Sequence, residues 1–265
     1  MCGDSVRIEL NGVSFGYNKD SAVLNNIDLI LDGPGLVCII GPNGVGKSTL
    51  VKCINKLVTP SSGEVLLDDQ NIKNMTLKEI SKSVGYVPVV SNDCFSMTVI
   101  DTILIGRHNH QRWKTTDLDL EFVHKVMKMM NIGDLAMRGF NELSAGQHQK
   151  VALARGLVQE PKLLILDEPT SNLDVRHQIY VTELLRAIAV KMDMTILMIS
   201  HDLNISAKYA HKVVMMANPG VIYNVGTPEE VITEDAIRHV YGVNCKVIMD
   251  ESRPYVMLRS ALPDW

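Results

Sequence analysis

Residues 41–49 place glycines, a lysine and hydroxyl side chains at the spacing of a phosphate-binding loop. The segment consists of Gly41, Pro42, Asn43, Gly44, Val45, Gly46, Lys47, Ser48 and Thr49. It fits the pattern G-x-x-x-x-G-K followed by serine or threonine, in which glycines let successive backbone N–H groups turn toward a phosphate. Lys47 would reach the β- and γ-phosphates of a nucleotide, and the Ser48 hydroxyl would ligate Mg²⁺. The sequence therefore predicts a nucleotide and magnesium site here.

Two neighbouring carboxylates follow an apolar segment later in the chain. Residues 163–166 are all leucine or isoleucine, and Asp167 and Glu168 come directly after them. Because ligands of open α/β sheets bind at the carboxyl ends of the strands, we expect both acids beside the phosphate loop. Asp167 would hold the metal, directly or through water, and Glu168 would polarise an attacking water. Two acids at a strand end can also cap the next helix, but the phosphate loop favours the nucleotide interpretation.

The segments around these motifs have the patterns of strands and helices that would position them. Residues 36–40 form an apolar run typical of a buried parallel strand, and residues 50–54 continue with helical spacing. Alternating apolar residues between positions 8 and 31 predict antiparallel strands. Residues 91–159 turn to helical spacing, and strand and helix alternate again from residue 161. The pattern indicates an α/β protein.

Residues 143–147 lie between the two motifs and read Leu-Ser-Ala-Gly-Gln at the start of an apolar helix. The hydroxyl of Ser144 and the N–H of Gly146 would form an anion site with no covalent chemistry of its own. The segment resembles the signature sequence of ATP-binding cassette (ABC) ATPases, usually written L-S-G-G-Q. In that family the signature contacts the γ-phosphate held by a partner subunit. The resemblance therefore implies that Ser144, Gly146 and Gln147 bind ATP across a two-fold interface.

The resemblance covers nearly the whole chain and implies a fold. We expect an α/β fold in which a P-loop (RecA-like) nucleotide-binding core carries an antiparallel β subdomain and an inserted α-helical subdomain. One ABC ATPase domain would span residues 1–265. The core with its antiparallel sheet would occupy residues 6–90 and 160–245, the helical subdomain with the signature residues 91–159, and a C-terminal tail residues 246–265.

Three further positions match nucleotide-binding residues of the family. Tyr17 matches the aromatic residue that stacks on adenine, and Asp174 lies in the loop that contacts the other subunit. His201 matches the switch histidine that holds the attacking water. Tyr17 has an alternative reading as a core residue, and a lone histidine at a strand end is more often a plain polar residue. The order of the motifs favours the family roles, with Glu168, His201 and Lys47 as catalytic residues and ATP and Mg²⁺ as cofactors.

The sequence departs from the family just after residues 85–88. The family has a glutamine there that ligates Mg²⁺ and couples the site to the membrane partner, whereas this chain has Val89. A valine side chain offers no oxygen to a hard cation. Water or a nearby polar group (Ser91, Asn92 or Asp93) would have to take that place. We therefore expect weaker Mg²⁺ dependence or slower turnover than the glutamine pattern would give.

Composition and charge exclude several classes of protein. The chain has 265 residues, of which 46% are hydrophobic and 21% charged, with a net charge of −4 and no basic stripe, which argues against a nucleic-acid partner. Its five cysteines are scattered without a C-x-x-C pair, and the two that flank the phosphate loop, Cys38 and Cys53, are expected to be small core residues in a reducing compartment. No apolar run approaches the roughly 20 residues of a membrane helix, and the N-terminus does not resemble a signal peptide. A membrane role would therefore depend on a partner protein.

Residues 98–107 narrow the expected function. They look like the T-V-x-D-x-V-L-x-G-R stretch of importers for iron–siderophore complexes, haem and cobalamin, in which the helical subdomain receives a coupling helix of the permease. The resemblance implies the ATP-hydrolysing subunit of such an importer at the cytoplasmic face of the cell membrane. Its partners would be a second copy of itself, an integral membrane permease and, indirectly, a substrate-binding protein. His108 and His110 follow in a polar segment, and we expect them to be solvated rather than to bind a metal.

Other classes stay open at this point. Importers of zinc or manganese share much of the same pattern, and the cargo contacts the permease rather than the ATPase. A soluble ABC ATPase that does not transport, such as an iron–sulfur assembly scaffold, would share the nucleotide motifs but should lack the pattern of residues 98–107. ABC proteins that act on DNA or ribosomes carry a long heptad-repeat insertion or two cassettes in tandem, and the sequence shows neither.

Overall fold

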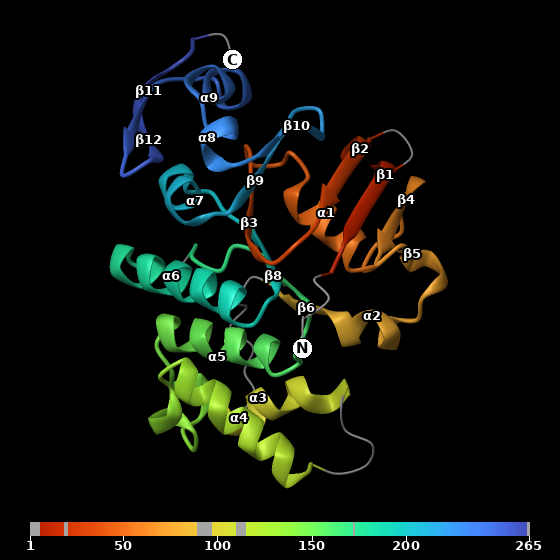
Figure 1. Ribbon diagram of the computed structural model, residues 1–265, viewed down its shortest axis with the longest axis vertical. Coiled ribbons are helices and arrows are strands. Elements are labelled where there is room, and N and C mark those ends of the chain that lie inside the picture. The colour runs from red at the N-terminus through yellow and green to blue at the C-terminus, as the bar shows by residue number, and fades with distance from the viewer. Residues whose placement is uncertain (1–5, 19–20, 89–96, 110–114, 172, 264–265) are drawn as a thin grey trace.

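The computed structural model describes residues 6–18, 21–88, 97–109, 115–171 and 173–263. Two sheets and the helices around them make up most of the molecule, and helices from the middle of the chain form a separate group at one end (Figure 1). The C-terminal hairpin lies at the opposite end from that helical group (Figure 1).

The central sheet has six strands in the order β10-β9-β3-β8-β7-β6. They are β3 (Gly35–Ile40), β6 (Val84–Val87), β7 (Leu163–Leu166), β8 (Thr195–Ile199), β9 (Lys212–Ala217) and β10 (Val221–Gly226). β10 pairs antiparallel with β9, and the other neighbours are parallel. β3, β7 and β8 are buried along their whole length, which explains why they are nearly continuous apolar runs. This sheet confirms the expected α/β fold class.

The second sheet has four strands in the order β2-β1-β4-β5. They are β1 (Ile8–Phe15), β2 (Leu24–Leu31), β4 (Ser62–Leu67) and β5 (Gln70–Asn71), and all their pairs are antiparallel. Buried and exposed positions alternate along most of β2, as expected of a sheet with one covered face. Helix α1 (Lys47–Ile54) shares one hydrophobic core with strands of both sheets. The element that carries the phosphate loop is therefore anchored on both sheets.

The middle of the chain folds into helices that pack around one another. The helices are α3 (Val99–Leu104), α4 (Asp117–Met129) and α5 (Ala145–Leu157), with short 3₁₀ segments η2 (Ile105–Asn109), η3 (Gly133–Leu135) and η4 (Phe140–Glu142). Thr98, Thr116 and Ser144 cap the three α-helices by accepting hydrogen bonds from backbone N–H groups. Of the apolar residues at helical spacing, Val123, Val126, Met127 and Met130 are buried and Leu120 is partly exposed, which fixes the face that α4 turns to the core.

The remaining helices pack on one of the two sheets or carry the C-terminal segment. They are η1 (Ile72–Asn74), α2 (Leu77–Ser83), α6 (Val175–Lys191), α7 (Leu203–Tyr209), α8 (Pro228–Val231) and α9 (Glu234–Tyr241). The chain then forms an antiparallel hairpin of β11 (Val243–Asp250) and β12 (Arg253–Ala261), which contacts α7 and α9. β11 runs across positions 245 and 246, where the sequence analysis separated the core from the tail. The other predicted domain limits stay predictions.

The fold bears on two expectations from the composition, the burial of cysteines and the lack of a membrane-spanning helix. Cys38 and Cys53 are buried, as expected of small core residues. Across the described ranges, none of the helices combines the length and apolar character that a membrane span requires.

Candidate nucleotide-binding site

The phosphate loop joins the end of β3 to the start of α1, as the sequence predicted. Gly46 stands at the N-cap of α1 with φ of 100°, in the left-handed region that favours glycine. A Cβ atom there would lie 2.9 Å from the carbonyl oxygen of Val23 and from a methyl group of Leu24. Gly46 therefore lets the loop approach the antiparallel sheet while it points backbone N–H groups toward a ligand.

Lys47 is 5% exposed and turns back over its own loop. Its Nζ donates hydrogen bonds of 2.8 Å to the carbonyl oxygens of Gly41 and Pro42. Burial lowers the pKa of Lys47, and the nearby charges of Glu168 and Asp167 oppose that effect. An anionic ligand in the loop would likewise favour the charged ammonium.

Ser48 and Asp167, the two predicted metal ligands, lie next to each other. The Ser48 hydroxyl donates to Oδ1 of Asp167 over 3.2 Å, and the Tyr86 hydroxyl donates to Oδ2 over 3.4 Å. Burial raises the pKa of Asp167, and the neighbouring Glu168 adds to this, while the hydrogen bond from Ser48 opposes it. A cation between the two side chains would relieve the cost of a buried carboxylate. Hydroxyl and carboxylate oxygens are the hard ligands that Mg²⁺ prefers, so the residues fit this ion.

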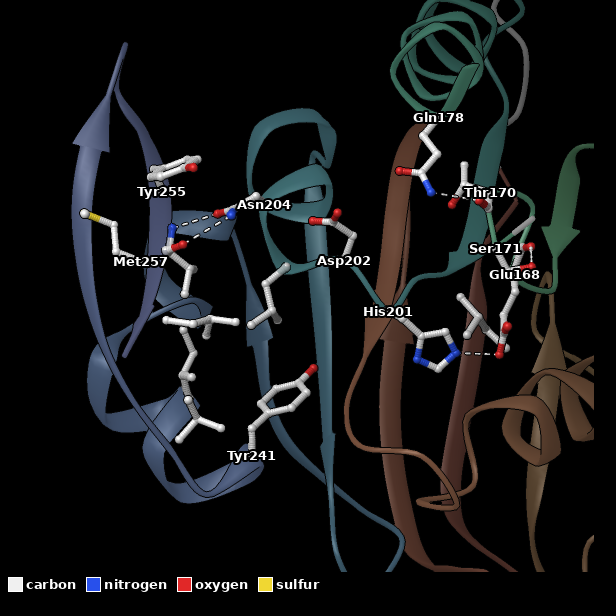
Figure 2. Close-up of a pocket in the computed structure, with 16 residues that line it drawn as sticks. Glu168, Thr170, Ser171, Gln178, His201, Asp202, Asn204, Tyr241, Tyr255 and Met257 are labelled. Atoms are coloured by element: carbon white, nitrogen blue, oxygen red, sulfur yellow. Dashed lines mark hydrogen bonds and ion pairs between the residues drawn. The ribbon is translucent and has the colours of Figure 1, made fainter. Parts of the chain in front are cut away.

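Glu168 and His201 form the closest polar contact of the site. His201 Nε2 lies 2.5 Å from Oε1 of Glu168 (Figure 2). The two residues follow β7 and β8, and the phosphate loop follows β3. Because β3, β8 and β7 are adjacent and parallel, all three loops emerge at the same edge of the sheet. The topology therefore brings together the predicted catalytic residues, which are far apart in sequence.

A cavity of about 920 Å³ opens beside this pair and extends to the C-terminal hairpin (Figure 2). Glu168 and His201 line one end, and Tyr241, Tyr255 and Val256 line the other. The hydroxyl of Tyr241 is buried near the backbone of Gly41 in the phosphate loop, and burial raises its pKa. The two predicted catalytic side chains therefore border open space rather than the packed core.

Tyr17 lies at the surface beside the phosphate-loop helix. Its side chain is 59% exposed, so it is not a core residue. The ring meets Phe15 edge to face with centroids 5.0 Å apart, and its hydroxyl lies 3.4 Å from Oγ1 of Thr49. An exposed ring held in this position is available to stack on a base, and that role stays a prediction.

The residues predicted to act across the two-fold interface lie at two helix N-termini. Ser144 and Gln147 form a capping box at the start of α5: Ser144 N donates to Oε1 of Gln147 over 3.0 Å, and Gln147 N donates to Oγ of Ser144 over 3.4 Å. Asp174 caps α6 by accepting from the backbone N–H of His177. The capping geometry accounts for these side chains within a single chain, and the N-terminal turn of α5 remains open to an anion.

A model of the ABC transporter family matches residues 24–171, more than half of the chain. The chain belongs to the ABC transporter family. It is 44% identical over 240 residues to an uncharacterized ABC transporter ATP-binding protein of Methanocaldococcus jannaschii, covering 91% of this chain and 93% of that protein. It is 35% identical over 254 residues to the ferric enterobactin transport ATP-binding protein FepC of Escherichia coli, covering 94% and 92%. The structure of cbiO1 from Clostridium perfringens, part of the ABC transporter complex cbiONQ, has a TM-score of 0.77 at 30% identity and covers 87% of this chain and 92% of its own.

Membership of the ABC transporter family settles the general activity. The chain is an ATPase and an ABC transporter ATP-binding subunit of the importer type. It binds ATP, as ABC ATPase domains do, generally with Mg²⁺. In the described part of the chain, no group of three or more His, Cys, Asp or Glu residues is placed to hold a metal.

Sequence reasoning missed some residues of this ABC site. Tyr86 donates to Asp167 because β6 pairs with β7, and only the sheet order reveals this contact. Tyr241, at the end of α9, lines the same cavity as Glu168 and His201, and only the packing of the folded chain reveals this. Five residues named in the predictions lie outside the described ranges. They are Val89, Ser91, Asn92, Asp93 and His110.

Proposed function

We propose that this ABC ATPase powers the import of an iron–siderophore complex, haem or cobalamin through a separate integral membrane permease. The observation that carries ATP hydrolysis is the meeting of the phosphate loop, the pair Asp167–Glu168 and His201 at one edge of the parallel sheet. The pattern of residues 98–107 and the similarity to FepC, whose name specifies ferric enterobactin transport, support the substrate class.

The proposed reaction is an in-line displacement at phosphorus. A water oxygen forms a bond to the γ-phosphorus while the bond to the bridging oxygen of ADP breaks, and ADP and inorganic phosphate leave. Glu168 accepts the proton that the water loses. His201 is already hydrogen-bonded to Glu168, so its imidazole lies within reach of a water bound to that base. We assign to it the holding of that water against the γ-phosphate.

Positive charge stabilises the transferred phosphoryl group. Lys47 exchanges the carbonyl oxygens of Gly41 and Pro42 for phosphate oxygens when the triphosphate binds. Backbone N–H groups of the loop and the N-terminus of α1 add fixed partial charge. Ser48 and Asp167 would hold Mg²⁺, which would supply further positive charge beside the β- and γ-oxygens.

A second copy of the chain completes each ATP site in this proposal. The N-terminal turn of α5, with Ser144, Gly146 and Gln147, would bind the γ-phosphate held by the loop of the partner subunit. The dimer closes on two Mg-ATP and opens after hydrolysis, and this cycle moves the permease between inward- and outward-facing states. The permease, and through it a substrate-binding protein, would hold the ATPase at the cytoplasmic face of the cell membrane. Nucleic acid has no part in this function.

The variant Glu168→Gln tests the proposed chemistry. It removes the proton acceptor while it keeps the size of the side chain, so we expect ATP binding to persist and the hydrolysis rate to fall by about 10²–10⁴-fold. Phosphate release measures the rate, and a fluorescent ATP analogue measures binding. Glu251→Gln, in the exposed hairpin turn between β11 and β12, is the control and should hydrolyse ATP at the parent rate. Full activity of Glu168→Gln would show that another group is the base.

Uptake measurements test the transport function. The ATPase is reconstituted in vesicles with the membrane protein that co-purifies with it, and the uptake of a ferric siderophore, haem, cobalamin, Zn²⁺ and Mn²⁺ is compared. ATP-dependent uptake of one of the three chelates supports the proposal. Uptake of Zn²⁺ or Mn²⁺ alone assigns the chain to the metal-ion importers. An active ATPase that captures no membrane protein would favour a non-transport ABC ATPase.

A further inference from the structure

The imidazole of His177 makes an unusual set of contacts with Asp174, the N-cap of α6. Its Nδ1 lies 2.9 Å from both carboxylate oxygens of Asp174, and its backbone N–H donates to Oδ1 of the same carboxylate over 2.9 Å. Hydrogen bonds from the backbone and the ring of His177 lower the pKa of Asp174. Since the ring is about half exposed, this orientation is set by Asp174 rather than by burial in the core.

The opposite edge of the same ring faces the signature. A Cβ atom added to Gly146 would lie 3.3 Å from Cδ2 and 3.6 Å from Nε2 of His177. Few real Cβ contacts are as close as 3.3 Å, so an alanine at position 146 would press against the ring. The imidazole therefore packs on the bare backbone of Gly146, and it joins the first turn of α6 to the first turn of α5.

A second contact between the two helices lies about one turn further along each. The ammonium group of Lys150 lies 4.6 Å from the ring centroid of Tyr180. Lys150 follows Gly146 by four positions and Tyr180 follows His177 by three, so both contacts lie on one pair of facing helix surfaces. α5 and α6 run beside each other in Figure 1. The contact of His177 with Gly146 is thus part of a helix pairing rather than an isolated approach.

The N-terminus of α6 is also tied to Glu168. Ser171 donates to the carbonyl oxygen of Glu168 from its hydroxyl (3.1 Å) and from its backbone N–H (3.3 Å). The side chain of Gln178 on α6 donates to the carbonyl oxygen of Thr170 over 3.1 Å (Figure 2). A continuous series of contacts therefore runs from Glu168 to the start of α6, and from His177 to Gly146.

We infer that His177 is a positioning residue that fixes the signature turn of each chain relative to the Glu168 segment of the same chain. The inference rests on the proposed function, in which that signature serves the ATP held by the partner subunit. A change at one γ-phosphate then moves the signature that closes on the other, and His177 couples the two ATP sites. The ring touches no nucleotide; it acts through Gly146 and Asp174.

His177→Ala is the first test. The N-cap of α6 uses the backbone N–H of residue 177, so the variant should fold, and thermal unfolding checks this. The affinity of the single chain for a fluorescent ATP analogue should stay within about twofold of the parent, because the phosphate loop is untouched. The turnover number should fall by about tenfold or more, since small misplacements of a catalytic surface are costly. The Hill coefficient for ATP should fall toward one. His124→Ala, an exposed histidine on α4, is the matched control and should behave as the parent.

Two further variants separate the contact with Gly146 from the capping of α6. His177→Asn keeps an N–H group for Asp174 but loses the ring over Gly146, and we expect it to be as impaired as His177→Ala. Gly146→Ala should displace the ring. The turnover number of the double variant Gly146→Ala/His177→Ala should therefore be no lower than that of Gly146→Ala alone. Parent-like activity of His177→Ala or of His177→Asn would overturn the inference, and so would multiplicative losses in the double variant.

Hydrogen exchange without nucleotide tests the link independently of the proposed function. The amides of Gln147 and His148, which bond to Ser144, should exchange faster in His177→Ala than in the parent and in His124→Ala. Equal exchange would contradict the link even in an active ATPase. Faster exchange in His177→Ala, together with a parent protein that neither hydrolyses ATP nor dimerises, would uphold the link and refute the proposed function.

Discussion

At the scale of single residues, burial is the main cause of the pKa shifts of two charged groups in the nucleotide site. Burial raises the pKa of Asp167 and lowers that of Lys47, so each group is held in a site that disfavours its charged form. A magnesium ion would compensate the carboxylate, and phosphate oxygens would compensate the ammonium. Binding of Mg-ATP would therefore favour the charged forms of both groups.

Position 89 gives a direct prediction about Mg²⁺. Val89 lies outside the described residues, and its side chain has no atom that ligates a hard cation. Val89→Gln supplies an amide oxygen, so we expect a lower half-saturating Mg²⁺ concentration and faster hydrolysis. A Mg²⁺ titration of the ATPase rate measures both, with Val89→Leu as the control for size. An unchanged titration in Val89→Gln would refute the expectation.

His211 gives a prediction about stability and pH. Its Nδ1 accepts a hydrogen bond of 2.9 Å from the backbone N–H of Leu36, at the start of the strand that leads to the phosphate loop. Burial lowers the pKa of His211 below 6.5, and the positive charges of Arg186 and Arg253 add to this. As the pH falls below about 6.5, the unfolded chain binds a proton that the folded chain does not. The stability contributed by the neutral ring is therefore present above that pH and is lost as the pH falls toward the folded-state pKa.

Urea unfolding at about pH 7.5 and about pH 5.5 measures this effect. We expect the parent to lose more unfolding free energy between the two pH values than His211→Asn. The asparagine oxygen still accepts from Leu36 but does not titrate. Equal losses in the two proteins would show that His211 does not contribute to the pH dependence.

At the scale of secondary structure elements, an ion-pair network holds the helical group together. Arg107 is 8% exposed; it donates to Asp119 on α4 over 2.9 Å and to Glu160 after α5 over 2.6 Å. It also donates to the backbone carbonyl of Val158 over 2.9 Å. One guanidinium therefore joins η2, α4 and the end of α5, which fixes the orientation of the signature helix.

Replacement of this arginine should destabilise the protein. Arg107→Met leaves the buried carboxylate of Asp119 without its counter-charge, and the expected loss of unfolding free energy is about 3–5 kcal/mol. Arg138→Met is the matched control, because Arg138 pairs with Glu142 at the surface over 3.6 Å, and the expected loss is about 1 kcal/mol or less. Urea unfolding of both variants measures the difference. Similar losses would contradict a structural role for Arg107.

The sequence predicted those elements whose pattern depends on local burial. β3, β7 and β8 were recognisable because strands covered on both faces are nearly all apolar. The hairpin of β11 and β12 was described only as a tail, because its outward face is largely exposed and its inner face packs on α7 and α9. Contacts such as Tyr86 with Asp167 and His177 with Gly146 were not predictable. They join segments whose proximity follows from the order of strands and the pairing of helices.

At the scale of the whole molecule, the phosphate loop and the signature belong to different parts of the fold. The loop is anchored between the two sheets, whereas the signature begins α5 in the helical group (Figure 1). The local motifs were readable from the sequence because each has a fixed spacing. Their combination into an ATP site across two chains follows from the family resemblance, and it stays a proposal because a single chain holds only one half of each site. The proposed function therefore requires two copies of the chain, each of which supplies the phosphate loop of one ATP site and the signature of the other.

Sedimentation velocity of the Glu168→Gln protein tests that reciprocity most directly. The slow hydrolysis of this variant should preserve the ATP-bound state. We predict monomers without nucleotide and with ADP, and dimers with ATP and Mg²⁺. Addition of Ser144→Arg, which places a bulky side chain at the signature turn, should abolish the dimer while the phosphate loop still binds ATP. A Glu168→Gln protein that is saturated with ATP and remains monomeric would contradict the account.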